Sequence, residues 1–307
     1  MPETSSHWSE LVALDAPMAK QFWLGYGAIG EGRRTSLIPS LFNVQSSNTA
    51  TEKSFGVGIL GSDGWEDFEN SGRVPYDDVH RGWEKTYTHS EFARGVVVER
   101  KLIDDNQTRI AFGRASSLGD SAYRKREKDA ARIFNNAFAT DTGPDGQYLC
   151  DTDHTYNSED STTYSNRGTT ALSKSAVGTT RVAMTKFVDD TGDVMDVMPD
   201  LLLIPPELED TAIEITRSQL DPTSANNAVN PQAGRFSYLV WHYLTDTNNW
   251  FMIEKARMKQ FLNWFDRVPV EFGAEEDFDT LQRKYRAYAR YSFGYDDARW
   301  IYGHVVA

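Results

Sequence analysis

The stretch Cys150-Asp-Thr-Asp-His154 places a thiol, two carboxylates and an imidazole within one short segment. These groups are usual ligands of Zn²⁺, and a tetrahedral site needs further ligands from elsewhere in the chain. The sequence contains neither an H-E-x-x-H nor a C-x-x-C motif to supply them. We therefore predict a structural loop. A metal-dependent hydrolase that uses Asp151, Asp153 and His154 remains the alternative.

Two other motifs lack the context that their chemistry needs. Gly56-Val-Gly58-Ile-Leu-Gly61 has the glycine spacing of a dinucleotide-binding loop, which requires a buried strand before it and a helix after it. The flanking residues predict neither element. Asp141 and Asp145 resemble the start of a calcium loop, but Thr152 stands where the bidentate Glu is needed. We therefore predict no catalytic, cofactor-binding or metal-binding residues, and no enzyme.

The composition excludes several classes of protein. The 307 residues have a net charge of −13, which argues against a dedicated DNA-binding or anionic-membrane protein. A single cysteine excludes an intrachain disulfide and favours a reducing compartment. The sequence shows no signal peptide and no apolar run near the roughly 18 residues of a membrane span. We expect a soluble protein, made in the cytosol, with no membrane partner.

The longest predicted element is a helix from about residue 104 to 138. Apolar residues recur three or four positions apart in both halves. Between them, the charged run from Arg124 to Asp129 indicates a solvated face. The helix would be roughly 50 Å long, whereas globular helices usually have ~10–14 residues. Gly113 and Gly119 are positions where it could bend. We interpret this element as a spine from which other parts extend.

Two segments are predicted to project from the body. Residues 1–35 combine aromatic side chains with four glycines between positions 25 and 32. These glycines oppose a stable element, so we expect an N-terminal arm that docks on another surface. Residues 54–85 are rich in glycine and carboxylates and are flanked by strand-like segments. An insertion of this kind inside a domain is usually functional or disordered, and we expect an extended hairpin-like loop.

The remaining elements alternate between helix and strand. Helices are predicted at 173–187 and 207–218, and an exposed loop at 221–235. The continuous apolar run at 200–204 indicates a strand covered on both faces. Further strands are predicted at 236–244, 250–255, 285–295 and 299–306. One long helix, shorter helices and antiparallel-looking strands together predict an α+β fold.

The order of these elements resembles that of the major capsid subunit of tailed bacteriophages, which has the HK97-like fold. The closer resemblance is to the Mu-like major head subunit (gpT-like) family. The segments that show it are Val74-Pro-Tyr-Asp-Asp-Val with Trp83-Glu-Lys-Thr-Tyr-Thr-His89, Ile133-Phe-Asn-Asn-Ala-Phe138, Asp145–His154, Leu202-Leu-Ile-Pro-Pro-Glu-Leu-Glu209, Asn226-Asn-Ala-Val-Asn230, and Tyr243-Leu-Thr-Asp-Thr247 before Trp250-Phe251. These segments cover residues 53–307, and the first ~50 residues match less well.

The resemblance implies a division of the chain. Residues 1–35 would be the N-terminal arm and residues 54–85 the extended loop. The peripheral domain would combine residues 36–53, 86–140 and 263–307, with the spine helix inside it. Residues 141–262 would form the axial domain.

The resemblance also implies a function. The chain would self-assemble, as hexamers and pentamers, into an icosahedral shell that encloses double-stranded DNA without binding it specifically. A separate scaffolding protein, a portal and a decoration protein would be its partners. Assembly would take place in the host bacterial cytoplasm, and the product would be the virion capsid. Candidates for contacts between subunits are Trp8, Phe22, Trp23, Trp65, Phe68, Tyr76, Trp83, Arg73, Arg81, Asn226 and Asn227.

Two alternatives stand beside this interpretation. One is an encapsulin-like nanocompartment shell, which would need a groove for cargo. The other is the metal-dependent hydrolase named above. Some relatives of the family cross-link a loop lysine to an asparagine. Lys53 and Lys85 lie at the base of the loop rather than at its tip, so we do not expect that chemistry.

Overall fold

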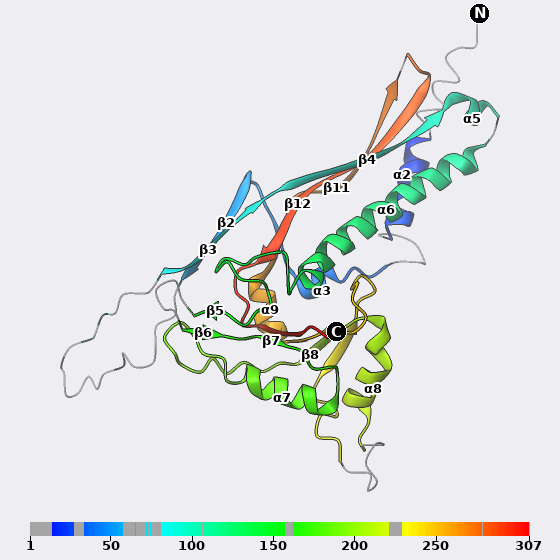
Figure 1. Ribbon diagram of the computed structural model, residues 1–307. Coiled ribbons are helices and arrows are strands. Elements are labelled where there is room, and N and C mark those ends of the chain that lie inside the picture. The colour runs from blue at the N-terminus through cyan, green and yellow to red at the C-terminus, as the bar shows by residue number, and fades with distance from the viewer. Residues whose placement is uncertain are drawn as a thin grey trace, which may run out of the picture.

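The structure is a computed structural model that describes residues 14–27, 34–57, 65, 72, 74, 76, 81–105, 107–156, 162–220, 229–277 and 279–306. The fold is α+β, as the sequence predicted (Figure 1). The described helices are α2 (Asp15–Tyr26), α3 (Ile38–Leu41), α5 (Arg100–Asp104), α6 (Thr108–Asn135), α7 (Lys174–Met184), the 3-10 turn η2 (Pro206–Leu208), α8 (Glu209–Arg217) and α9 (Lys255–Phe261). The described strands are β1 (Asn43–Ser46), β2 (Thr51–Val57), β3 (Arg81–Thr88), β4 (Ser90–Glu99), β5 (His154–Thr155), β6 (Thr163–Tyr164), β7 (Arg167–Gly168), β8 (Leu201–Ile204), β9 (Ser237–Val240), β10 (Trp250–Ile253), β11 (Leu262–Asp277), β12 (Gln282–Tyr295) and β13 (Ile301–His304).

The first sheet, called the long sheet below, has four strands. Its strand order is β1-β11-β12-β4, with β12 antiparallel to both β11 and β4 and with β1 parallel to β11. Along β12 the side chains alternate, so that Tyr285, Ala287, Ala289 and Tyr291 are buried on one face. This is the face that the sequence pattern predicted. Because β4 is an edge strand, the backbone groups on its outer side have no strand partner within the described sheet.

Helix α6 lies along the buried face of this sheet (Figure 1). Its 28 residues confirm the predicted long helix, which begins four residues later than expected because the chain forms the separate helix α5 first. Ala111, Ala115 and Leu118 pack toward the sheet, and Ala130, Ile133 and Phe134 enter the main core. At 1.5 Å per residue, α6 is about 42 Å long.

The charged run in the middle of α6 is not wholly solvated, contrary to the prediction. Glu127 and Asp129 are buried. The Glu127 carboxylate accepts hydrogen bonds from Ser36 Oγ at 2.5 Å and from Trp241 Nε1 at 3.2 Å. The Tyr291 hydroxyl donates to Asp129 at 2.6 Å. These carboxylates face protein donors on neighbouring elements, which offsets the cost of taking them out of water.

Helix α2 packs against α6, which corrects the expectation that the glycines prevent a stable element near residue 25. Gly25 lies inside the helix, and Gly27 ends it with a positive φ of 81°. A Cβ atom on Gly25 would lie 2.0 Å from the Ser116 carbonyl oxygen, and one on Gly119 would lie 2.1 Å from the Phe22 carbonyl oxygen. The two glycines therefore allow the backbones of α2 and α6 to approach each other closely.

A second sheet lies at the other end of α6 and is flanked by α7 and α8 (Figure 1). Its strand order is β7-β13-β10-β8-β9. Every residue of β8 is buried, as its continuous apolar run predicted. Strand β13 pairs with β10 in this sheet, so the chain after β12 crosses from the long sheet into the second one. The predicted boundary, which kept all of 263–307 with the spine helix, differs from this arrangement.

The two sheets share one hydrophobic core. Phe134 of α6 lies at ring-centroid distances of 5.7 Å from Trp241, 5.6 Å from Phe251 and 6.3 Å from Trp300. The same buried cluster includes Trp264 of the long sheet. Aromatic pairs at these separations and near-perpendicular angles add to the free energy of burial. The C-terminal end of α6 is therefore fixed between the two sheets.

Candidate functional site

The metal-ligand candidates are hydrogen-bonded within the protein. His154 is fully buried, and its Nδ1 lies 2.5 Å from Asp145 Oδ2. Asp151 Oδ1 accepts from the Thr152 backbone N–H at 2.7 Å. Burial raises the pKa of the Cys150 thiol well above its ordinary range. Among the residues that the structure describes, no three His, Cys, Asp or Glu side chains form a group that could hold a metal ion. The loop is thus held together by its own polar side chains.

The base of the predicted extended loop is an antiparallel pair of strands, β2 and β3. The carboxylate of Asp296, at the end of β12, joins this pair to the body. It accepts hydrogen bonds from Ser54 Oγ of β2 at 2.8 Å, from the Tyr87 hydroxyl of β3, and from Asn263 Nδ2 of β11 at 2.7 Å. Burial raises the pKa of Asp296, and these hydrogen bonds oppose that shift.

A second polar contact fixes the junction between β3 and β4. The buried His89 has its Nε2 3.0 Å from Ser47 Oγ and its Nδ1 3.0 Å from Ser292 Oγ. Burial and the nearby Arg290 guanidinium lower the pKa of His89. Sequence reasoning missed both anchors, since a lone His after a strand and an Asp-Asp pair in a turn carry no distinguishing pattern.

The described contact candidates fall into two groups. Trp65 and Tyr76, between β2 and β3, are 90% and 93% exposed, and Trp83 is half-buried on β3. Phe22 is fully buried and Trp23 half-buried, both on α2. Phe22 packs on Phe272 of its own chain with ring centroids 4.8 Å apart, so it is not available to a second subunit, and its prediction as a contact residue is wrong.

The other candidates cannot be placed. Trp8, Phe68, Arg73, Asn226 and Asn227 lie outside the described residues. For Arg81, only the backbone is described, within β3.

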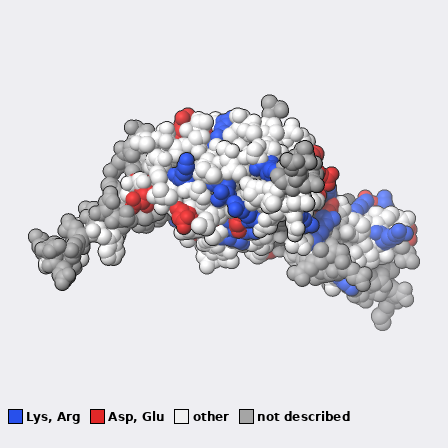
Figure 2. Space-filling model, turned by 90° about the horizontal axis from the view of Figure 1, so that it is seen from below, with Lys and Arg blue, Asp and Glu red and all other residues white. Residues whose placement is uncertain are grey.

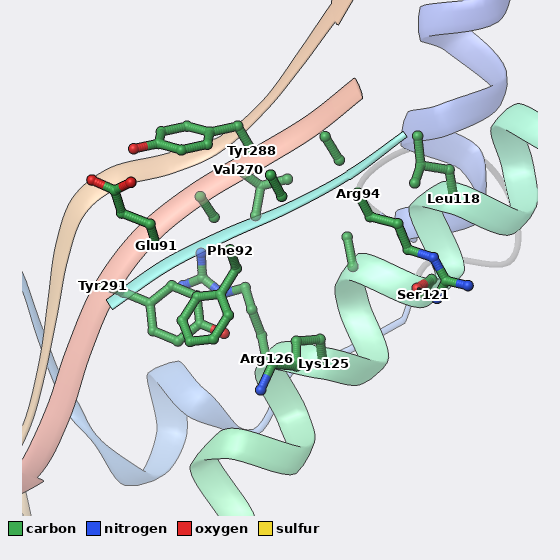
Figure 3. Close-up of a pocket in the computed structure, with 14 residues that line it drawn as sticks. Glu91, Phe92, Arg94, Leu118, Ser121, Lys125, Arg126, Val270, Tyr288 and Tyr291 are labelled. Atoms are coloured by element: carbon green, nitrogen blue, oxygen red, sulfur yellow. Dashed lines mark hydrogen bonds between the residues drawn. The ribbon is translucent and has the colours of Figure 1, made fainter. Parts of the chain in front are cut away.

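A groove runs between α6 and the edge strand β4 (Figure 3). One part is a hollow of about 380 Å³ with an apolar floor that includes Leu118, Val270 and Ala287. Over its rim, Lys125 Nζ lies 4.5 Å from the centroid of the Phe92 ring. The adjoining part, of about 440 Å³, is lined by Arg94, Val96, Ser117, Leu118, Ser121, Arg124, Lys125 and Lys128, with no carboxylate among them.

The charge of the surface is unevenly distributed although the whole chain is acidic. Figure 2, which views the molecule from below, shows Lys and Arg side chains gathered in the middle of that face. No helix in the described part of the chain combines the length and the apolar content needed to cross a membrane.

Comparisons with known proteins agree with this architecture. The sequence profile of a family described as phage capsid protein matches residues 83–303. No curated protein matches the sequence. Among solved structures, the capsid of bacteriophage JBD30 decorated with minor capsid protein trimers has 18% identity and a TM-score of 0.55, and the match covers 69% of this chain and 92% of that one.

Two further solved structures have the same fold. The procapsid of bacteriophage JBD30 has 16% identity and a TM-score of 0.52, over 97% of this chain and 75% of that one. The capsid of cyanophage P-SCSP1u has 11% identity and a TM-score of 0.57, over 91% and 90%. The comparisons support a shell-forming role and neither of the two alternatives. The chain belongs to the phage capsid protein family and is a structural subunit of a phage shell.

Proposed function

We propose that this chain is the major head subunit of a phage of the Mu-like (gpT-like) type, and that it tiles an icosahedral shell as hexamers and pentamers. The observation that supports tiling most directly is the pair of aromatic side chains, Trp65 and Tyr76, that the single chain leaves almost fully exposed. Exposed aromatic groups of this size are typical of surfaces that another protein covers. The segment that bears them starts from a base fixed by Asp296 and His89.

The two sheets correspond to two proposed domains. The peripheral domain consists of α6 with the β1-β11-β12-β4 sheet, and the axial domain consists of the β7-β13-β10-β8-β9 sheet with α7 and α8. In this division β13 belongs to the axial domain, because its hydrogen bonds are made with β10 and β7. The arm, residues 1–35, then includes α2, which packs on α6 of the same chain.

The proposed partners follow from this role. A scaffolding protein guides assembly in the cytoplasm of the host bacterium, and a portal occupies one vertex. A decoration protein binds the shell, and the similar JBD30 capsid is decorated with minor capsid protein trimers. Packaged double-stranded DNA is enclosed without sequence-specific binding, since the net charge of −13 disfavours tight adhesion of DNA to the wall.

Co-expression with the scaffolding protein of the same phage tests the proposal. We expect negative-stain electron microscopy to show closed shells of uniform size. Replacing residues 59–79 with a short Gly-Ser linker should leave a folded subunit with an unchanged melting temperature that forms no stable shells. A wild-type chain that stays monomeric or dimeric with scaffold present contradicts the proposed function, and normal shells from the deletion variant contradict the role of the loop.

A further inference from the structure

We propose that the groove between α6 and β4 binds a single-chain amphiphilic anion, of the class of a fatty-acid carboxylate, with its tail in the apolar hollow and its head group beside Arg94. This inference goes beyond the proposed function and does not depend on it, because it concerns the unassembled chain. The two parts of the groove share Arg94, Leu118, Ser121 and Lys125 among their lining residues, so the apolar hollow and the cationic part are continuous.

The first observation is that two cations of the groove lack acidic partners. Arg94 and Lys128 are exposed, and neither forms an ion pair with a carboxylate in the described part of the chain. Lys125, by contrast, is neutralised by Asp129, whose Oδ1 lies 2.6 Å from its Nζ. Arg94 Nη1 donates to Ser121 Oγ at 2.9 Å across the groove. A guanidinium presents a fork of N–H donors that matches a carboxylate, and the remaining donors of Arg94 suit such a head group.

The second observation is the apolar hollow that adjoins these cations. Its volume of about 380 Å³ falls in the usual range for small-molecule sites, roughly 300–1,000 Å³. Leu118, Val270 and Ala287 belong to its floor, and the stacked rings of Phe92 and Tyr291, 4.6 Å apart, form one wall (Figure 3). A hydrocarbon chain placed there leaves water without needing a hydrogen-bond partner.

The sign of the charge at the head-group position follows from the lining residues. The carboxylate that borders the hollow is Glu91, and its Oε1 lies 3.7 Å from Arg290 Nε on the neighbouring strand β12. In Figure 3 the Glu91 side chain points away from Arg94 and Lys125. The local charge beside Arg94 is therefore positive, which favours an anion over a neutral or cationic amphiphile with the same tail.

The combination of the two parts favours a small amphiphile over DNA. A phosphate backbone would contact the cations and leave the apolar hollow in water, and an inorganic anion would do the same. A ligand that joins an apolar tail to one anionic head uses both parts at once.

Calorimetric titration of the purified, unassembled full-length chain tests the site. Hexanoate, octanoate and decanoate are compared, each below its micelle concentration. We expect the affinity to rise about 3–4-fold for each added methylene, because each one leaves water in the hollow. Decanol has the same chain length without the charge, and it should bind at least ~10-fold more weakly than decanoate. Equal affinities for decanoate and decanol, or no saturable binding of decanoate, overturn the inference.

Variants locate the ligand within the groove. Arg94→Glu should weaken decanoate binding at least ~10-fold and leave decanol binding unchanged, whereas Ala122→Phe, which fills part of the hollow, should weaken the binding of both. Lys186→Glu, an exposed charge reversal outside the groove, is the matched control and should bind like wild type. Unchanged decanoate binding by Arg94→Glu overturns the inference. Because Arg94 is exposed, this variant decides the question even if Ala122→Phe fails to fold.

Competition distinguishes the amphiphile from other occupants. Octanoate should displace bound decanoate, and duplex DNA should not. Displacement by duplex DNA at a lower concentration than by octanoate identifies a phosphate site. If a folded Ala122→Phe variant changes the sedimentation of the chain but not its decanoate affinity, the groove is a contact between copies. Either result overturns the inference and leaves the proposed function standing, whereas a failure of shell assembly counts against the proposed function alone.

Discussion

Helix α2 and the segment between β2 and β3 differ in the exposure of their aromatic side chains. Both combine aromatic residues with glycine, and both were predicted to be completed by other subunits. In the structure, Phe22 of α2 is fully buried against its own chain, whereas Trp65 is 90% exposed. The difference lies in what the glycines do. Gly25 and Gly119 admit close helix packing, while no helix is described between β2 and β3.

Aromatic content alone therefore does not identify a contact between subunits. An aromatic residue at helical spacing opposite a small residue on another helix is already satisfied within the chain. An aromatic residue surrounded by carboxylates and glycines has no such partner nearby. Variants on the two sides of the comparison should therefore separate folding from assembly.

The largest expected effect is on Phe22. Phe22→Ala removes a ring packed on Phe272, Leu118 and Ala287, and should lower the free energy of unfolding by about 3–5 kcal/mol. Trp65→Ala should change it by less than ~0.5 kcal/mol, because the ring is in water, yet should reduce shell yield. Urea denaturation of the unassembled subunit and negative-stain counts measure the two effects. If Phe22→Ala and Trp65→Ala lowered the free energy of unfolding equally, the two aromatic side chains would not differ in burial as described.

The next effect concerns the close approach of α2 and α6. Gly119→Ala places a methyl group 2.1 Å from the Phe22 carbonyl oxygen, so the helices must separate, at a cost of about 2–3 kcal/mol. Gly113→Ala is the matched control in the same helix, since nothing lies within 4 Å of its added methyl group. It should stabilise the protein by roughly 0.5–1 kcal/mol through helix propensity. Thermal melts of both variants measure these effects. A shift of the melting temperature in the same direction for both variants would contradict the close packing of α2 on α6.

A smaller effect is expected at the base of the loop. Asp296→Ala leaves the Tyr87 hydroxyl and the Asn263 amide without their acceptor, which should cost about 2 kcal/mol. Hydrogen exchange should speed up in β2 and β3 and stay unchanged in α2. Asp277→Ala, which removes an ion pair with Lys284, serves as the control and should change the stability much less, because solvent screens this pair. Uniform exchange changes across the molecule would show that the anchor is not local.

The smallest effect is a pH dependence at the junction of β3 and β4. Burial lowers the pKa of His89 below its ordinary 6.5, so the unfolded chain binds the proton more readily and this residue's contribution to stability is lost as pH falls below about 6.5. Glu52 of β2, Arg290 of β12 and Arg267 in β11 are the charged groups that act on it.

The measurement compares wild type with His89→Gln. Near pH 7 the variant should be less stable by about 1 kcal/mol, through the altered contacts with Ser47 and Ser292. The difference in stability between wild type and variant should become smaller as the pH is lowered toward 5. His304, whose pKa burial lowers to about 4, is present in both proteins, so its titration cancels. A stability difference that does not change with pH would exclude His89 as the titrating group.

Periodic elements were predictable from the sequence, and contacts between distant segments were not. The apolar spacing of α6, the buried run of β8 and the alternation of β12 each reflect a local geometry that the sequence repeats. The role of Gly119 depends on α2, about a hundred residues earlier, and so the glycine was interpreted as a bend. The burial of Glu127 likewise depends on Ser36 and Trp241, which no local pattern connects to it.

The candidate site was predicted only in part. The aromatic residues between β2 and β3 were identified from composition, and two of them, Trp65 and Tyr76, are exposed as expected. Phe22 was wrongly predicted as a contact residue. An aromatic residue buried within its own chain and one buried by a neighbouring subunit look the same in the sequence. The anchors Asp296 and His89 were missed, since a single acceptor or imidazole shared by several strands has no signature in the sequence of any one strand.

Phe134 packs among aromatic rings of both sheets, so α6 is held most firmly at its C-terminal end. The helix is rigid and about 42 Å long, so a tilt of about 10° at this end displaces the opposite tip by roughly 7 Å. Any repacking of the rings that tilted the helix would therefore displace α2 and the far end of the long sheet most, because they lie farthest from Phe134.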